Sequence, residues 1–263
     1  MLRGWAPVET YFSGLGTSPA ARVLAKNGYI TLAPDFFGYA QSDPEPSDTW
    51  EARFVKPINV IELLLSVEKF GLPIPELETV DDEQIITSDS LPPLQLFIWA
   101  HSNGAQIALS VLEILSRPIP TTLWAPVTAP FPYSILFYGD ELEDEGKEQR
   151  AWLAMFERDH NAREYSITQH LGRLSGPLQL HHGSADEAAL KTWSDEFNDK
   201  ILAENKRRVD SSANEEDEEV ELIDLEYFVY SGADHNLRPV ENWNLAITRD
   251  MQFFADHTQL SSP

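Results

Sequence analysis

Short apolar runs alternate along the chain with longer segments of helical periodicity. The apolar runs predict buried strands at 29–35, 94–100, 121–125, 177–183 and 225–232. Between them, apolar residues that recur every three or four positions predict helices. These helices are expected from Pro19 to a cap at Gly28, and over 48–71, 103–116, 148–158, 188–202 and 239–255. Strands separated by such helices are typical of βαβ units, so the pattern predicts an α/β fold with a mostly parallel sheet flanked by helices.

Three segments interrupt this alternation. Residues 72–93 are rich in proline and acid, and residues 203–221 are polar and low in complexity, so both are expected to be acidic loop insertions. Between 126 and 165 the periodicity is weak. This segment is either a cap whose aromatic residues line an acyl or alcohol pocket, or a loop that packs on the body of the domain.

Composition narrows the possible functions. With 263 residues, 42% of them hydrophobic, the chain can bury one sizeable core. Its net charge of −24 argues against nucleic acid or an anionic membrane surface as a partner. No apolar run is long enough to predict membrane insertion, and the first residues lack a secretory signal, so nothing beyond a cytoplasmic default is predicted for localisation. The oligomeric state is not predicted.

Cofactor chemistry has no support in the sequence. The chain has no cysteine, which excludes a thiolate nucleophile, a disulfide and a zinc–thiolate site. Acidic and histidine residues show no compact ligand spacing. The sequence therefore predicts neither a metal nor another cofactor.

Three chemically useful residues follow predicted strands. Ser102 comes after 94–100, Asp186 after 177–183 and His235 after 225–230. Because parallel α/β sheets bind ligands at the carboxyl ends of their strands, we expect these side chains to lie at one edge of the sheet. Asp186 alone could be a helix cap and His235 alone a surface residue. Together, in the chain order Ser, Asp, His, they predict a catalytic triad.

The stretch "WAHSNGAQ" (99–106) shows how the serine would be presented. Ala100-His101-Ser102-Asn103-Gly104 fits the pattern G-x-S-x-G with alanine at the first small position. A tight strand-turn-helix bend lifts the serine above the sheet and requires small neighbours. The Asn103 N–H can then face a developing oxyanion, with His235 as base and Asp186 orienting it. His101 and His182 also adjoin strand ends and are expected to be structural, held by backbone partners.

Four stretches resemble the α/β-hydrolase family, and within it the prolyl-oligopeptidase and dienelactone-hydrolase branch. They are "APDFFGYAQSD" (33–43), "WAHSNGAQIAL" (99–109), "PLQLHHGSADE" (177–187) and "YSGADHN" (230–236). The resemblance implies one α/β-hydrolase domain over 3–263, with 126–165 as a possible cap within it. It also implies that Ser102 is the nucleophile, Asp186 the acid and His235 the base.

The N-terminus departs from the family pattern. "RGWAPVETY" (3–11) looks like the family segment that follows a central strand, with Arg3 in place of the usual histidine. By this likeness Trp5 offers the second oxyanion N–H. Only Met1 and Leu2 remain of that strand, which should lie between 29–34 and 94–100, and the strands that normally precede it are missing. We therefore expect a truncated start.

Three functions follow from these observations. The first is a serine hydrolase that cleaves carboxylic esters through an acyl-enzyme. The second is a serine peptidase of prolyl-oligopeptidase type. The third is a hydrolase-like binding module with impaired catalysis, because the sheet is expected to be incomplete. A small-molecule ester or a peptide is the expected substrate.

Overall fold

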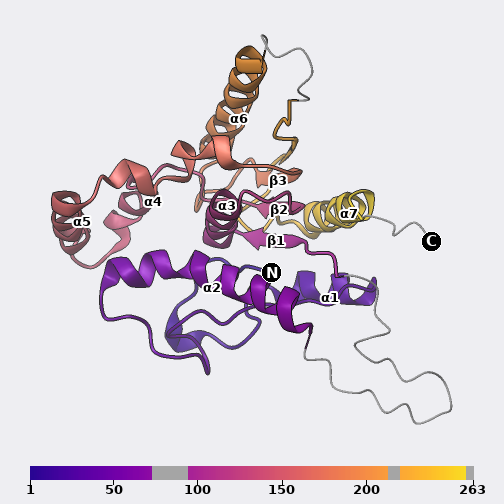
Figure 1. The fold of residues 1–263 in the computed structure, drawn as a ribbon. Coiled ribbons are helices and arrows are strands. Elements are labelled where there is room, and N and C mark those ends of the chain that lie inside the picture. Colours follow the sequence, from indigo (N-terminus) through magenta and orange to yellow (C-terminus); the bar gives the residue numbers. More distant parts are fainter. Residues whose placement is uncertain (73–93, 213–219, 259–263) are drawn as a thin grey trace.

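The computed structural model describes residues 1–72, 94–212 and 220–258 (Figure 1). Its sheet has the order β1-β2-β3-β4, and all neighbouring strands are parallel. The strands are β1 (Ile98–His101), β2 (Thr121–Trp124), β3 (Leu178–Gly183) and β4 (Leu225–Tyr230). Because all four strands run parallel, their carboxyl ends lie at the same edge of the sheet. The predicted α/β fold class is confirmed.

The helices start and end close to the predicted positions, except that α6 ends ten residues later than predicted and the short α4 was not predicted. They are α1 (Ser18–Lys26), α2 (Thr49–Phe70), α3 (Asn103–Leu115), α4 (Tyr133–Leu136), α5 (Lys147–Asp159), α6 (Lys191–Ser212) and α7 (Val240–Asp256), with short 3-10 turns between them.

Local capping explains the ends of α2. The Asp48 carboxylate accepts hydrogen bonds from the amides of Trp50 and Glu51, each at 2.9 Å. Gly71 ends α2 with φ 74°, a value that favours glycine. The loop predicted over 72–93 lies, from residue 73 onward, outside the described residues.

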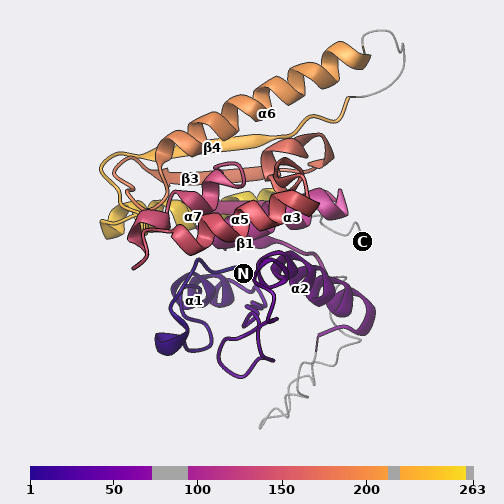
Figure 2. The same cartoon turned by 90° about the vertical axis from the view of Figure 1, so that its left-hand side faces the viewer.

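Helices cover both faces of the sheet (Figures 1 and 2). Successive strand side chains point to opposite faces, so Leu123 and Trp124 belong to different hydrophobic clusters. On one face the strands pack with α2, α3 and α6, through residues such as Val60, Leu109, Leu112, Leu180 and Phe197. On the other face they pack with α1 and α7, through residues such as Leu24, Trp99, Ala246 and Phe254. The sheet whose ends carry the catalytic candidates is therefore stabilised by helices packed on both of its faces.

The strand predicted over 29–35 is wrong, and the strand predicted from residue 94 begins only at Ile98. The reason is the short segment between them. Leu2 forms a single parallel bridge with Ala100, donating its amide to the Trp99 carbonyl at 2.8 Å. On the other side, the Met1 amino group donates to the Leu32 carbonyl at 2.6 Å. Met1 and Leu2 thus lie between 29–35 and β1, as the sequence predicted. They offer too few backbone groups for 29–35 to pair with them as a strand.

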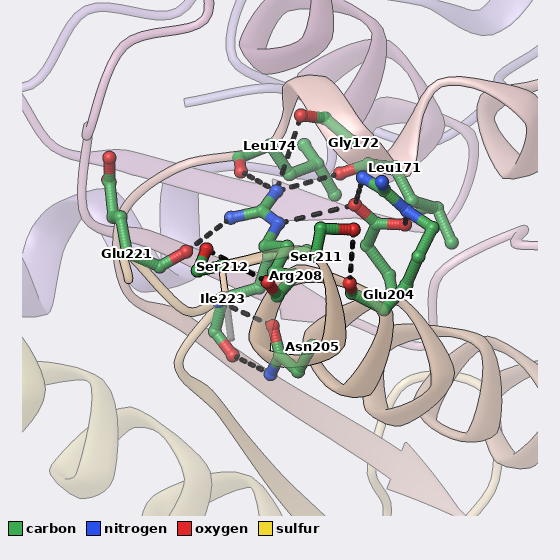
Figure 3. Close-up of polar contacts among 11 residues, drawn as sticks. Leu171, Gly172, Leu174, Glu204, Asn205, Arg208, Ser211, Ser212, Glu221 and Ile223 are labelled. Atoms are coloured by element: carbon green, nitrogen blue, oxygen red, sulfur yellow. Dashed lines mark hydrogen bonds and ion pairs between the residues drawn. The ribbon is translucent and has the colours of Figure 1, made fainter. Parts of the chain in front are cut away.

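The loop predicted over 203–221 is wrong for its first part, because α6 continues to Ser212. The end of this helix is fixed by Arg208 and Asn205 (Figure 3). The Arg208 guanidinium donates to the carbonyls of Glu221 at 2.7 Å and Leu174 at 2.8 Å, and more weakly to those of Leu171 and Gly172. The Asn205 amide exchanges two 2.8 Å hydrogen bonds with the Ile223 backbone. These contacts stabilise helix where composition alone indicates a loop.

Replacing Arg208 by alanine should lower the free energy of unfolding by about 2–3 kcal/mol, because several backbone carbonyls lose a charged donor in a largely buried setting. Arg207→Ala is the matched control. The Arg207 side chain is 62% exposed and pairs only with Glu204 on its own helix, so its loss should change stability little. Urea denaturation of both variants checks this. Equal effects would show that the Arg208 contacts do not hold the end of α6.

Candidate active site

Ser102 lies at a strained turn between β1 and α3. Its backbone adopts φ 56° and ψ −124°, a conformation that residues other than glycine rarely adopt. The Ser102 amide donates to the Trp124 carbonyl at 2.8 Å, which ties the turn to the end of β2. The sharp strand-turn-helix bend expected from the sequence is present.

Two glycines allow the N-terminal segment to lie directly on this turn. A Cβ on Gly104 would stand 2.4 Å from the Leu2 carbonyl oxygen and 2.5 Å from that of Arg3. A Cβ on Gly4 would stand 2.9 Å from the Ser102 Cβ. Gly104 is thus needed because another backbone crosses it. Gly4 was not identified as a site residue from the sequence. The only indication in the sequence was a glycine within "RGW", next to the predicted oxyanion-hole residue Trp5.

The backbone amides of Asn103, the first residue of α3, and of Trp5, which follows Gly4, have no acceptor among the described residues. The Trp5 side chain is 74% exposed, so its amide rather than its indole is the group of interest. A helix N-terminus with a free amide attracts negative charge. The assignment of these two amides as an oxyanion hole stays a prediction.

Asp186 and His235 are joined at the ends of β3 and β4. The His235 Nδ1 lies 2.8 Å from the Asp186 Oδ2. The other carboxylate oxygen, Oδ1, accepts the amides of Ala188 and Ala189, both at 2.9 Å. Burial by itself raises the pKa of Asp186, but hydrogen bonds from His182, His235 and the Ala189 amide outweigh it and hold this pKa well below its usual range. The Asp186 carboxylate is therefore ionised and able to orient an imidazole.

His182 and His101 support this pair, and both have the backbone partners that the sequence predicted. His182 Nε2 lies 2.8 Å from the Ala189 carbonyl and 3.3 Å from Asp186 Oδ2, while its Nδ1 contacts the Ser194 hydroxyl at 2.7 Å. His101 Nε2 lies 2.9 Å from the His235 carbonyl. Burial and the neighbouring His235 lower the pKa of His101 to about 4. His101 is therefore neutral at pH 7.

The nucleophile candidate stands beside this arrangement. The ring of His101, the residue before Ser102, lies 4.8 Å from the His235 ring between centroids. Among the described residues, the Ser102 hydroxyl makes no hydrogen bond, so its link to His235 Nε2 is not formed in this structure. Hydrogen bonds of catalytic groups are often long without substrate and tighten when it binds. The structure joins the candidate acid and base, and the transfer of the Ser102 proton stays a prediction.

Comparisons with known proteins identify the fold. No family model and no curated protein sequence matches the chain. Among solved structures, Est1E from Butyrivibrio proteoclasticus, with ferulic acid bound, gives a TM-score of 0.56 at 14% identity, over 97% of this chain and 88% of its own. A 2-hydroxy-6-oxo-6-phenylhexa-2,4-dienoate hydrolase from a Rhodococcus species gives 0.56 at 17% identity, over 97% and 89%. This chain has the α/β-hydrolase fold.

A peptidase shares this fold at lower coverage. The puromycin-hydrolyzing peptidase of Mycobacterium tuberculosis gives a TM-score of 0.52 at 15% identity over 80% of this chain. Only 26% of the peptidase is covered, so the chain spans about a quarter of its length. The α/β-hydrolase fold of this chain has fewer strands than these neighbours.

Within this α/β-hydrolase fold, the loops that carry Asp186 and His235 pack on each other. A Cβ on Gly183, the last residue of β3, would stand 2.2 Å from the Ala233 carbonyl oxygen and 2.6 Å from that of Asp234. The Ala185 amide also donates to the Ala233 carbonyl at 2.9 Å. The loop after β4 therefore rests directly on the end of β3, which fixes the distance between Asp186 and His235.

Segment 126–165 forms its own aromatic cluster beside α2. Phe131 and Phe156 are buried there and pack with Trp50 and Phe54 of α2. Tyr133 is 70% exposed, so not every aromatic residue of the segment is used for packing. Figure 1 shows that α4 and α5 extend beyond the sheet, away from the end where α7 lies. Whether this part of the α/β-hydrolase fold acts as a cap stays a prediction.

Two further findings concern residues 1–72, 94–212 and 220–258. No group of three or more His, Asp or Glu side chains there is arranged to hold a metal ion. No helix of these ranges combines the length and the apolar character that crossing a bilayer requires.

Proposed function

We propose that this protein is a serine hydrolase that cleaves carboxylic esters through an acyl-enzyme. The observation that carries the proposal is the 2.8 Å contact between His235 Nδ1 and the ionised Asp186, located beside a strained serine turn. A buried carboxylate that fixes one imidazole nitrogen leaves the other free to accept a proton. The candidate nucleophile is the hydroxyl of Ser102, on the strained turn between β1 and α3.

The reaction follows from these positions. The Ser102 Oγ attacks the ester carbonyl while His235 Nε2 takes its proton, and the oxyanion is bound by the amides of Asn103 and Trp5. The imidazolium then gives the proton to the departing alcohol, which leaves the acyl group on Ser102. Water is activated by His235 in the second half and releases the acid. Asp186 remains ionised throughout and stabilises the imidazolium.

The chain's fit to known structures favours ester cleavage over peptide cleavage. It aligns with nearly the whole of Est1E, whose structure holds ferulic acid, but with only a quarter of the puromycin-hydrolyzing peptidase. About three quarters of that peptidase lies outside the alignment, whereas ester cleavage needs only a pocket beside the serine. A small-molecule ester is therefore the first substrate class to test, and a peptide the second.

The test compares p-nitrophenyl acyl esters with aminoacyl p-nitroanilides. Because an amine leaving group needs more help from an acid, an esterase should turn over the ester and leave the anilide nearly untouched. Comparable turnover of both would favour the peptidase. A fluorophosphonate probe separates both from a binding module. A folded protein that neither reacts with the probe at Ser102 nor cleaves any ester would overturn the proposed function.

A further inference from the structure

A small pocket between α2 and α3 carries positive charge next to the candidate nucleophile. Its volume is about 70 Å³. The wall from α2 contains Arg53, Phe54, Lys56 and Pro57, the wall from α3 contains Asn103, Gln106, Ile107 and Ser110, and segment 126–165 adds Phe131 and Tyr165. α2 and α3 lie side by side in Figure 1. Among the described residues, no acidic side chain lines this pocket, although the chain carries 43 acidic residues.

The cations of the pocket lack strong counter-charges. The Arg53 side chain makes no hydrogen bond and no ion pair with any residue that the structure describes, and its guanidinium lies 5.7 Å from the centre of the Phe131 ring. Lys56 has one carboxylate neighbour, Glu45, at 3.7 Å, and that side chain is 45% exposed. Burial lowers the pKa of Arg53 to about 10, and burial also lowers that of Lys56. Arg53 is therefore cationic at pH 7, and its charge is incompletely neutralised by the described residues.

The pocket starts one residue after Ser102. Asn103, Gln106 and Ser110 lie along one face of α3, and seven residues of helix rise about 10 Å. A group bound among them is thus within about 10 Å of the serine turn along the helix axis. The free amide at the start of α3 adds to the positive potential. This distance suits a second functional group on the acyl part of a bound ester.

We propose that the Arg53–Lys56 pocket binds a carboxylate carried by the acyl part of the substrate, so that the preferred substrates are hemi-esters of dicarboxylic acids. The inference rests on the proposed function and specifies its substrate class. A carboxylate suits the small volume, and the flat guanidinium fork can hold both its oxygens. The aromatic side chains of Phe54, Phe131 and Tyr165 lower the polarity of the pocket wall, which strengthens the charge interaction.

The test uses p-nitrophenyl hemi-esters of succinate, glutarate and adipate beside the same compounds with the free acid methylated. We expect kcat/KM to be higher for at least one free acid than for its methylated form. Arg53→Gln should remove this preference, lowering kcat/KM for the acid roughly ten- to a hundredfold relative to kcat/KM for the methylated ester. Arg150→Gln, the same charge change at an exposed position of α5, should alter neither.

Each outcome decides the inference. A preference that is lost in Arg53→Gln and kept in Arg150→Gln supports it. Equal turnover of acid and methylated ester by the unmodified protein, or equal losses in Arg53→Gln, overturns it. If no ester is cleaved at all, the proposed function fails. Glutarate binding measured by calorimetry then decides whether the pocket is an anion site. Binding that Arg53→Gln abolishes supports an anion site on its own, and binding that is absent or insensitive to Arg53→Gln overturns it.

Discussion

Replacing Ser102 by alanine should lower kcat for an activated ester by roughly 10⁴- to 10⁶-fold, because the variant keeps the binding groups and loses the atom that becomes acylated. The Ser102 hydroxyl makes no hydrogen bond among the described residues, and alanine fits the same crowded position beside Gly4. The fold should therefore be unaffected. Activity measured together with thermal unfolding separates loss of the nucleophile from loss of structure.

Ser211→Ala is the control for this experiment. Ser211 is exposed on α6 and donates only to the Arg207 carbonyl of its own helix, so its removal should leave kcat unchanged. Fluorophosphonate labelling should disappear in Ser102→Ala and persist in Ser211→Ala. If Ser102→Ala retained more than about a hundredth of the activity, another nucleophile would have to be sought.

Asp186→Asn should lower kcat by roughly 10⁴-fold while the protein stays folded. An amide in place of the carboxylate can no longer stabilise a charged imidazole, and a nitrogen facing His235 would force the ring into the wrong tautomer. The remaining oxygen of the Asn side chain can still accept the hydrogen bonds from the amides of Ala188 and Ala189. Glu187→Gln, the same chemical change at the exposed neighbouring residue, should leave kcat near its original value. Similar losses in both variants would argue against a special role for Asp186.

The pH dependence of stability gives a second readout for this residue. Since the pKa of Asp186 is depressed in the folded protein, its ionised form stabilises the fold at pH values above the unfolded pKa of about 4. That contribution is lost as the pH falls through the folded-state pKa. The difference in unfolding free energy between the original protein and Asp186→Asn should therefore shrink as the pH is lowered below about 4, and urea denaturation at several pH values measures it. A difference that stays constant would mean that the folded and unfolded pKa values are alike.

The sequence predicted best what depends on local signals. Each triad candidate directly follows an apolar run, and Asp48 and Gly71 mark the ends of α2, so these positions could be found from neighbouring residues alone. The strand expected over 29–35 failed because a strand needs a partner, and Leu2 provides only one bridge. The helical end of α6 was missed because its stability depends on Arg208 reaching carbonyls far away in the sequence.

The Arg53–Lys56 pocket could not be predicted from the sequence either, because it too depends on contacts between distant segments. Arg53 is one arginine in a predicted helix, and nothing near it in the sequence indicates that Asn103 and Phe131 will surround it. His101 likewise could be expected to find a backbone partner, but not that this partner would be the carbonyl of His235. Contacts between segments far apart in the sequence can be read only from the three-dimensional arrangement.

Gly183 has a consequence for how this molecule can acquire new specificities. Because the backbone after β4 sits on that glycine, with no space for even a methyl group, the imidazole and its carboxylate form one inflexible unit. In our proposal, recognition depends instead on α2 and on the segment after β2, and neither contributes a residue to that unit. We expect directed evolution to shift substrate choice through these outer elements, and to find almost no tolerated variants beneath the proton-transfer pair.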